Sequence, residues 1–434
     1  MIETRIAESL GLLWLDGGLH GDLLSLCTLG GRLSGTQSER AAVDWLEKRL
    51  ADASGQAVRR HPVAYAGWRS KRCTVERIGA SRADLLQAQP LVGSHVTGAR
   101  GATAEVVDLG RGTPEDFAAH AAALRGRIAL VRHEYMFASG HVHRRRKMQM
   151  AMDHGAVGFL IGAHLPGIGP VAGSSGRAGG PGIPGAGISH ESATLLADGA
   201  RARIIIEAEE GAASADNLIA EIPGETDSWV VLSAHIDGHD LAASAMDNAS
   251  GLAVVLAVTR ALAPLVPHFR RGLRVALFNV EEWALTGSKA YVEGLSQADR
   301  DRIVLNVNLD SVAGSTKLSA LTSGFAGVEA FLSQIAASCG MPIGLHRPLM
   351  VNSDHANFAA AGIPAFRLVA GFDQPGSNLR YVLTPADTAD KIAATELKAA
   401  ALFTAHAVAR ACTASDSRAA SFRGTPADAA RPPS

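Results

Sequence analysis

Residues 229–237 read WVVLSAHID, and this stretch decides how the rest of the chain is interpreted. Its first six residues are apolar or small, and the run ends in a histidine and an aspartate two positions apart. A short continuous apolar run is typical of a strand in a parallel sheet whose two faces are both covered. In open α/β sheets, ligand-binding residues follow the carboxyl ends of the strands. We therefore expect His235 and Asp237 at the edge of such a sheet.

The same pattern returns three times further along the chain. Apolar runs at 273–279, 303–308 and 365–369 alternate with the helical patterns of 248–262 and 393–409. Alternating strands and helices are the signature of a sheet wound in both directions with helices on its faces. The sequence predicts an α/β fold with a doubly wound, mixed, mainly parallel sheet.

The segment from about 96 to 213 interrupts this pattern with short strands and a Gly/Pro-rich stretch at 162–187. We expect an inserted, smaller, β-rich domain at 96–213, between two parts of the main domain at 1–95 and 214–412. The glycine-rich stretch is expected to form a mobile flap or a loop near the site. The last segment, 413–434, is rich in Ala, Ser, Arg and Pro and is expected to be disordered.

Composition excludes several classes of partner. The 434 residues include 41 basic and 42 acidic side chains, which gives no electrostatic footprint for nucleic acid or an anionic membrane. The four cysteines are widely spaced, so the sequence indicates neither a zinc ribbon nor a disulfide framework. Because no signal-peptide pattern and no long apolar run are present, a cytoplasmic protein is expected.

Ionisable residues follow the predicted strands or precede the predicted helices. Each has an ordinary structural explanation when taken alone, such as a helix N-cap for the aspartate at 247. Taken together, histidines and carboxylates at one edge form a ligand set suited to zinc, and one carboxylate can bridge two ions. The candidates are His235, Asp237, Asp247, Glu281, Glu282, Asp310 and His355.

A charge balance favours a pair of ions in this set. The charge of two zinc ions is matched by Asp247, Glu282 and Asp310 together with one hydroxide. Glu281 is then left as an additional carboxylate that can take a proton from bound water. Adjacent side chains at a strand end diverge, so one glutamate can bind metal while its neighbour meets the water.

Five motifs in this order resemble those of the co-catalytic zinc aminopeptidase family, which also contains the glutamate carboxypeptidases. Many members of that family carry a protease-associated domain inserted before the first zinc ligand. The resemblance also includes GRLSGT at 31–36 and NLIAEIPG at 217–224. The five motifs are SAHID at 233–237, MDNASG at 246–251, NVEE at 279–282, NLD at 308–310 and SDHANF at 353–358.

The resemblance implies a role for each candidate residue. Asp237 would hold the free ring nitrogen of His235, and Glu281 would be the general base. The peptide bond between Asp247 and Asn248 is expected to be cis. The ligand assignment implied by the resemblance is His235 and Glu282 on one zinc, Asp310 and His355 on the other, and Asp247 as the bridge.

The chain departs from the family at one position. Members often carry His-Thr ahead of a final Asp-Thr, whereas here Leu383 stands where that histidine is expected. A group that could help to stabilise the oxyanion is therefore missing, and Tyr381 is a candidate substitute. This departure bears on rate and substrate type more than on metal binding.

Two other polar segments have simpler explanations. We interpret His239 and Asp240 as a solvated loop pair. The basic run HRRRK at 143–147 is interpreted as a solvated helix face.

The function predicted is a zinc-dependent exopeptidase with two zinc ions per chain, other divalent transition metals being possible. An aminopeptidase acting on peptides or small amides is expected. A carboxypeptidase, dipeptidase or amidase on the same site is the alternative. A non-catalytic receptor or scaffold is disfavoured, because the five proposed ligands and Glu281 are all present.

Overall fold

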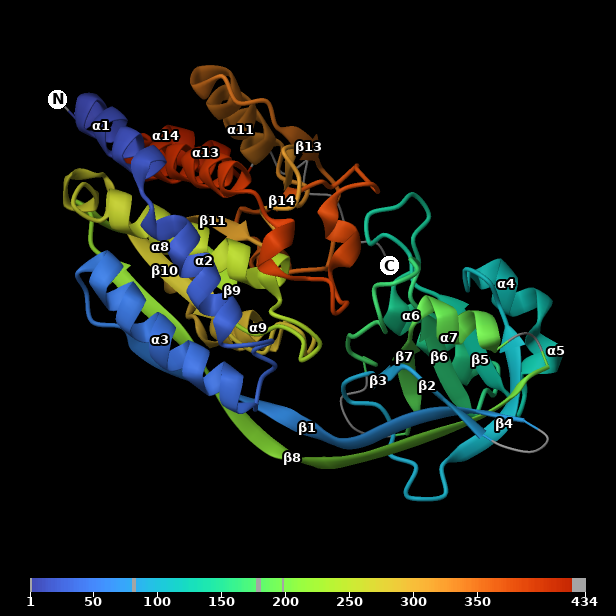
Figure 1. Cartoon of the computed structure of the whole chain (residues 1–434). Helices are drawn as coiled ribbons and strands as arrows, with labels where there is room; N and C mark the ends of the chain where they lie inside the picture. The colour runs from blue at the N-terminus through green and yellow to red at the C-terminus, as the bar shows by residue number, and fades with distance from the viewer. Residues whose placement is uncertain (1, 80–82, 177–180, 197–198, 424–434) are drawn as a thin grey trace.

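The structure is a computed structural model that describes residues 2–79, 83–176, 181–196 and 199–423. The chain forms two lobes joined by one long antiparallel ribbon (Figure 1). The ribbon consists of β1 (Arg59–Ile78) and β8 (Arg201–Ile222), which pair along most of their length. One end of β8 pairs with the sheet of the larger lobe, and its other end pairs with a strand of the smaller lobe.

The sheet of the larger lobe confirms the predicted fold class. Its strand order is β13-β12-β14-β11-β9-β10-β8, and the central strands are parallel. Strands β8 and β12 run antiparallel to their neighbours β10 and β14, and β13 lies at the edge beside β12. The strands are β9 (Thr226–His235), β10 (Arg271–Phe278), β11 (Ile303–Leu309), β12 (Leu318–Leu321), β13 (Gly344–His346) and β14 (Ala365–Ala370).

Helices cover both faces of this sheet because successive strand residues point to opposite sides. In β9, Val230 and Leu232 pack into the core that includes α8, whereas Val231 packs into the second core with Phe358 of α12. The first face carries α1 (Ile2–Leu15), α2 (Gly18–Thr28), α3 (Gln37–Ser54), α8 (Ser250–Leu262), α11 (Ala326–Cys339) and α13 (Ala394–Thr413). The second face carries α9 (Thr286–Gly294) and α12 (His355–Ala360), with α10 (Gln297–Arg302) leading into β11.

Local sequence sets where the helices begin and end. The hydroxyl of Thr36 accepts the main-chain N–H of Glu39 and caps the start of α3. Gly55 ends that helix in the left-handed conformation, with φ of 65°. The short helical turns are η1 (Ala245–Ala249), η2 (Val266–His268), η3 (Asn378–Tyr381) and η4 (Ala389–Lys391).

The smaller lobe is built around a second set of parallel strands. The division of the chain at residues 96 and 213 stays a prediction; β3 precedes residue 96 and pairs with β7 in this lobe. The strands are β2 (Ala83–Leu86), β3 (Ala88–Pro90), β4 (Ala102–Asp108), β5 (Ile128–Arg132), β6 (Gly158–Gly162) and β7 (Gly185–Ile188). The helices are α4 (Pro114–Ala119), α5 (Ala121–Leu124), α6 (Arg144–Asp153) and α7 (His190–Leu195).

The expectation of disorder from residue 413 onward is wrong for the first part of that segment. Residues Asp416–Ser421 form the helix α14, whose start is capped by Ser415. Phe422 is buried, and its ring lies 4.8 Å from that of Phe331 in α11. One aromatic side chain therefore anchors a segment whose composition is otherwise typical of disorder. Residues 424–434 lie outside the described residues.

Among the described helices, none has both the length and the apolar character needed to cross a membrane.

Candidate metal centre

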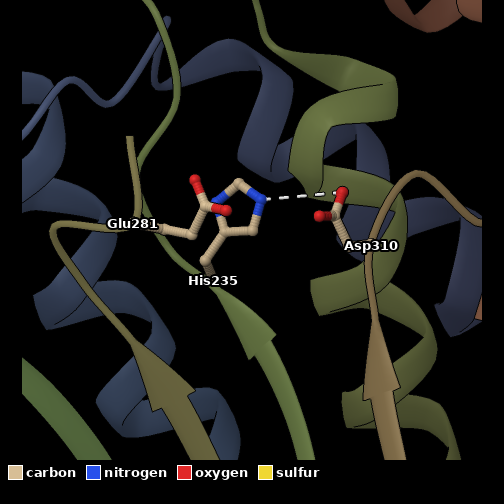
Figure 2. Close-up of side chains that lie close together, drawn as sticks. All are labelled: His235, Glu281 and Asp310. Atoms are coloured by element: carbon tan, nitrogen blue, oxygen red, sulfur yellow. Dashed lines mark ion pairs between the residues drawn. The ribbon is translucent and has the colours of Figure 1, made fainter. Parts of the chain in front are cut away.

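Three buried side chains meet beyond the carboxyl ends of the neighbouring strands β9, β10 and β11. They are His235, the last residue of β9, Glu281, which follows β10, and Asp310, which follows β11 (Figure 2). Each offers a ligand atom, and these atoms all lie within 4.8 Å of one another. The edge predicted from the strand ends is therefore where the polar side chains gather.

Asp247 approaches the same group from the loop before α8. Its Oδ1 lies 3.1 Å from Nε2 of His235, and Oδ1 of Asp310 lies 3.7 Å from that nitrogen. The peptide bond between Asp247 and Asn248 is cis, as the family resemblance implies. The buried carboxylate of Asp387 accepts the main-chain N–H groups of Met246 at 2.8 Å and Asp247 at 3.3 Å, which fixes this loop.

Asp237 acts on the site through two different groups. The ring nitrogen Nδ1 of His235 donates to the main-chain carbonyl of Asp237 at 2.9 Å, while the carboxylate is 3.9 Å away. That carboxylate instead accepts the main-chain N–H groups of Glu281 at 3.0 Å and Glu282 at 3.2 Å. Asp237 therefore holds the free ring nitrogen of His235, as expected, and does so through its main-chain carbonyl, while its carboxylate orients the two glutamates.

The two glutamates point to different partners. Glu281 faces His235 and Asp310, whereas Oε2 of Glu282 lies 2.7 Å from Nε2 of His239. The backbone turns sharply just before them, because Val280 has a positive φ of 60°. His235 lies beside Asp310 and Glu282 lies beside His239, so these distances do not favour the predicted sharing of one zinc by His235 and Glu282.

His355 is not part of the group formed by His235, Glu281 and Asp310, and its expected role as a ligand stays a prediction. It begins α12, its side chain is fully buried, and neither ring nitrogen has a hydrogen-bond partner within the described residues. Burial and the neighbouring guanidinium of Arg367 lower the pKa of His355 to about 3. No carboxylate of the described residues lies within 4.0 Å of its ring nitrogens.

His239 is the residue that sequence reasoning missed. The residue is only 5% exposed, so its interpretation as part of a solvated loop pair is wrong, although Asp240 is exposed as expected. The available signal was its position four residues after His235, in a loop that leads to the next candidate ligand.

Arg367 is a second residue that was missed. Its Nη2 lies 3.0 Å from Oδ1 of Asp310, and both side chains are almost completely buried. A charged residue inside the apolar strand β14 was the signal for it. Although burial favours the neutral acid, Arg367 and His235 hold the pKa of Asp310 below its usual range.

Burial shapes the electrostatics of the other groups. It raises the pKa of Glu281 well above its usual range, reinforced by Glu282 and opposed by His235. Burial lowers the pKa of His235, but Glu281, Asp247 and Asp310 more than offset it, so that pKa is raised. Carboxylates and imidazoles whose pKa values are shifted by burial and by one another are typical of functional sites.

A cavity of about 500 Å³ opens between the two lobes over this group. One wall carries Asp247, Glu281, Glu282 and Asp310, and the facing wall carries His143, Arg144 and Arg145 from the start of α6. Apolar side chains, including Met136, Met350 and Leu383, complete the lining.

The basic run at 143–147 is therefore not a solvated helix face. Arg144 is 7% exposed and Lys147 is 1% exposed. Lys147 pairs with Glu134 at 2.7 Å, whereas Arg144 and Arg145 face the cavity. Charged residues of the smaller lobe thus close the site.

The segments expected near the site differ in what they contribute. Tyr381 is not among the residues lining the cavity; its hydroxyl accepts a hydrogen bond from Arg380 at 2.9 Å, so its expected oxyanion role has no support in its position. The glycine-rich stretch reaches the site, because the N–H of Ala172 donates to the carbonyl of Leu383 at 2.8 Å. Gly173 lies against the guanidinium of Arg144, where a Cβ would come within 2.0 Å.

The donor set fits a transition-metal centre. Nε2 of His235, Nε2 of His239 and Oε1 of Glu282 are buried without a hydrogen-bond partner among the described residues. Buried polar atoms are normally paired, and imidazole with carboxylate is the ligand chemistry of zinc. The α/β sheet, the donor set and the cavity together define a metal-dependent hydrolase.

Comparison with known proteins gives this class a family. The model of peptidase family M28 matches residues 217–408, and the model of the PA domain matches residues 102–196. The aminopeptidase YwaD of Bacillus subtilis is 29% identical over 329 residues, which cover 74% of this chain and 69% of that protein.

Solved structures share the fold over nearly the whole chain. A peptidase M28 precursor from Shewanella amazonensis has a TM-score of 0.81 at 23% identity and covers 96% of this chain and 98% of its own. BSAP, a zinc aminopeptidase from Bacillus subtilis, has a TM-score of 0.75 at 23% identity, with coverage of 93% and 97%. Residues 217–408, in the larger lobe, thus match peptidase family M28, and residues 102–196, in the smaller lobe, match the PA domain.

Proposed function

We propose that this chain is a zinc-dependent aminopeptidase with two zinc ions. The observation that carries the proposal is the convergence of buried imidazole and carboxylate groups on one side of the cavity, in a chain that matches family M28. Relatives named as aminopeptidases support the same activity. Peptides with a free amino end, or small amides, are the proposed substrates.

The distances favour a division of the ligands between two metal positions. His235 and Asp310 would hold one ion, Glu282 would hold the other, and Asp247 would bridge them. When bound, paired zinc ions polarise the scissile carbonyl and make a bound water a good nucleophile at neutral pH.

Glu281 is the proposed general base. Its carboxylate lies beside His235 and Asp310, lines the cavity and is not needed as a ligand. It would take a proton from the attacking water and pass it to the leaving amine, which gives one side chain both proton transfers. The Asp237 carboxylate would keep it in place through the main-chain N–H of Glu281.

The test is the Glu281→Gln variant assayed with a leucyl anilide. General-base removal is expected to lower kcat by about 10²–10⁴-fold while zinc content stays that of the unchanged enzyme. Glu293→Gln is the matched control, because Glu293 is a solvent-exposed glutamate on α9. Substantial activity in Glu281→Gln would overturn the base assignment, and equal hydrolysis of the N-acetylated substrate would overturn the aminopeptidase assignment.

A dipeptidase or carboxypeptidase activity on the same site is the second candidate, and Arg144 favours it. Its Nε donates to the carbonyl of Ser174 at 3.0 Å, but within the described part of the chain its two terminal nitrogens have no hydrogen-bond acceptor. A nearly buried guanidinium with a free fork is suited to bidentate recognition of a carboxylate.

Substrate pairs that differ only at the carboxyl end separate the two candidates. A dipeptidase should cleave Leu-Gly much faster than leucyl-glycinamide, and Arg144→Gln should remove that preference. Arg146→Gln is the control, since Arg146 is an exposed neighbour on the same helix. Equal rates on both substrates would favour the general aminopeptidase.

A further inference from the structure

We propose that His239 is the nitrogen ligand of the second metal position, together with Glu282 and the bridging Asp247. The proposal rests on the proposed two-metal centre and names a ligand that neither the motifs nor the comparisons assign. It assigns the metal role to His239, a loop histidine, and not to His355. The position of Leu383 supplies no ligand.

The contact between His239 and Glu282 is the first observation. Nε2 of His239 lies 2.7 Å from Oε2 of Glu282, and the two side chains are only 7% and 11% exposed. The same Nε2 and the other carboxylate oxygen, Oε1, have no hydrogen-bond partner among the described residues. A simple ion pair would leave Oε1 of Glu282 without a partner, whereas a cation bound between the two side chains would be coordinated by both of them.

The backbone of His239 is held rigidly, as expected for a metal ligand. Its main-chain N–H donates to Oγ of Ser244 at 3.0 Å, and that hydroxyl donates to the carbonyl of His239 at 3.3 Å. Gly31 packs directly on this carbonyl, where a Cβ would come within 1.9 Å of the oxygen.

Arg32 braces the two ends of the same loop. The fully buried guanidinium donates to the carbonyls of Ile236 at 3.0 Å, Ala243 at 2.7 Å and Ser244 at 2.9 Å. The loop that carries His239 is therefore fixed by neighbours that do not themselves supply ligands, which is how protein sites preorganise a metal.

The surroundings leave His239 as the nitrogen donor for this position. Leu383 lines a small cavity together with His239 and Asp247, so the position where relatives often carry a histidine faces the same space with an apolar side chain. Among the described residues, no other histidine nitrogen lies within 4.0 Å of Glu282.

The resulting centre is chemically balanced. One position has His235 and Asp310, the other has His239 and Glu282, and Asp247 serves both. Each position then receives one imidazole and two carboxylates, three ligands that would leave the fourth position of a tetrahedral zinc open to water.

Metal content tests this assignment without depending on activity. His239→Ala and His355→Ala are loaded with zinc, desalted and measured by elemental analysis beside the unchanged enzyme. We expect two zinc ions per chain in the unchanged enzyme and in His355→Ala, and one in His239→Ala. Two zinc ions in His239→Ala, or one in His355→Ala, would overturn the assignment.

A spectroscopic measurement guards against misfolding. In the cobalt-substituted enzyme, His239→Gln should alter the visible d–d bands of one ion and leave those of the other, with an unchanged circular dichroism spectrum. Identical cobalt spectra in the variant and the unchanged enzyme would contradict the proposal. If the unchanged enzyme binds no metal, the proposed function itself fails; if it binds two and His239→Ala also binds two, only this inference fails.

Discussion

Replacing Asp237 by asparagine separates the two roles that this residue has in the structure. Its carboxylate accepts the N–H groups of Glu281 and Glu282 and the hydroxyl of Ser34 at 3.0 Å, while its carbonyl accepts from His235. Asparagine keeps the main-chain carbonyl, but it replaces one oxygen of the carboxylate by an NH₂ group, which cannot accept a hydrogen bond. The variant is expected to lose the positioning of the glutamates and to keep that of His235.

The magnitude follows from the hydrogen bonds that are lost. A hydrogen bond to a charged group contributes about 1.5–3 kcal/mol, and a neutral one about 1 kcal/mol. Asp237→Asn loses one of the hydrogen bonds from the N–H groups of Glu281 and Glu282 and weakens the other. This is expected to raise the activation free energy by about 3 kcal/mol, which corresponds to about a hundredfold decrease in kcat/KM.

The assay combines kcat/KM on a leucyl anilide with zinc content by elemental analysis. Asp237→Asn should lose about two orders of magnitude in rate yet retain the zinc that His235→Ala loses. Asp240→Asn is the matched control, because Asp240 is an exposed aspartate in the same loop. Equal loss of zinc in Asp237→Asn and His235→Ala would show that the carboxylate, not the carbonyl, orients the histidine.

Three further outcomes are expected. Arg32→Ala should lower the free energy of unfolding by about 3–5 kcal/mol in urea melts, because it strands buried carbonyls; a change below 1 kcal/mol would contradict the bracing role. Phe422→Ala should cost about 3 kcal/mol, while Leu12→Ala, at a site 70% exposed, should stay within about 0.5 kcal/mol; similar effects would mean that α14 is not anchored. Chelation should abolish hydrolysis and lower Tm, since the clustered carboxylates then repel one another, and zinc should restore both; activity that survives complete metal removal would refute the metal centre.

Periodicity predicted the larger lobe well, because its buried strands read as uninterrupted apolar runs. The run before His235 and the one before Asp310 both proved to be central strands with their carboxyl ends at the site. Parallel strands bring those ends to one edge, so sequence order alone was enough to gather His235, Glu281 and Asp310.

The direction of individual side chains could not be read in the same way. His239 lies in the loop after β9 and His355 begins α12, yet only His239 lies beside Glu282. A motif match selected His355, but the fold buries that residue at the start of α12. The contact of His239 depends on a loop held by Gly31 and Arg32, more than 200 residues away in sequence from it.

Contacts between the lobes were also hidden from the sequence. A helix with three arginines and a lysine in succession has the composition of a solvated face, and only the closure of the smaller lobe over the sheet shows why Arg144 is buried. Likewise, the composition of residues 413–434 did not indicate that Phe422 is buried and anchors α14.

Anomalous diffraction at the zinc edge from zinc-loaded crystals tests the central claim most directly. Two peaks are expected on either side of Asp247, one in contact with His235 and Asp310 and the other in contact with Glu282 and His239. A single peak, or two peaks away from Asp247, would contradict the two-metal centre proposed for this enzyme.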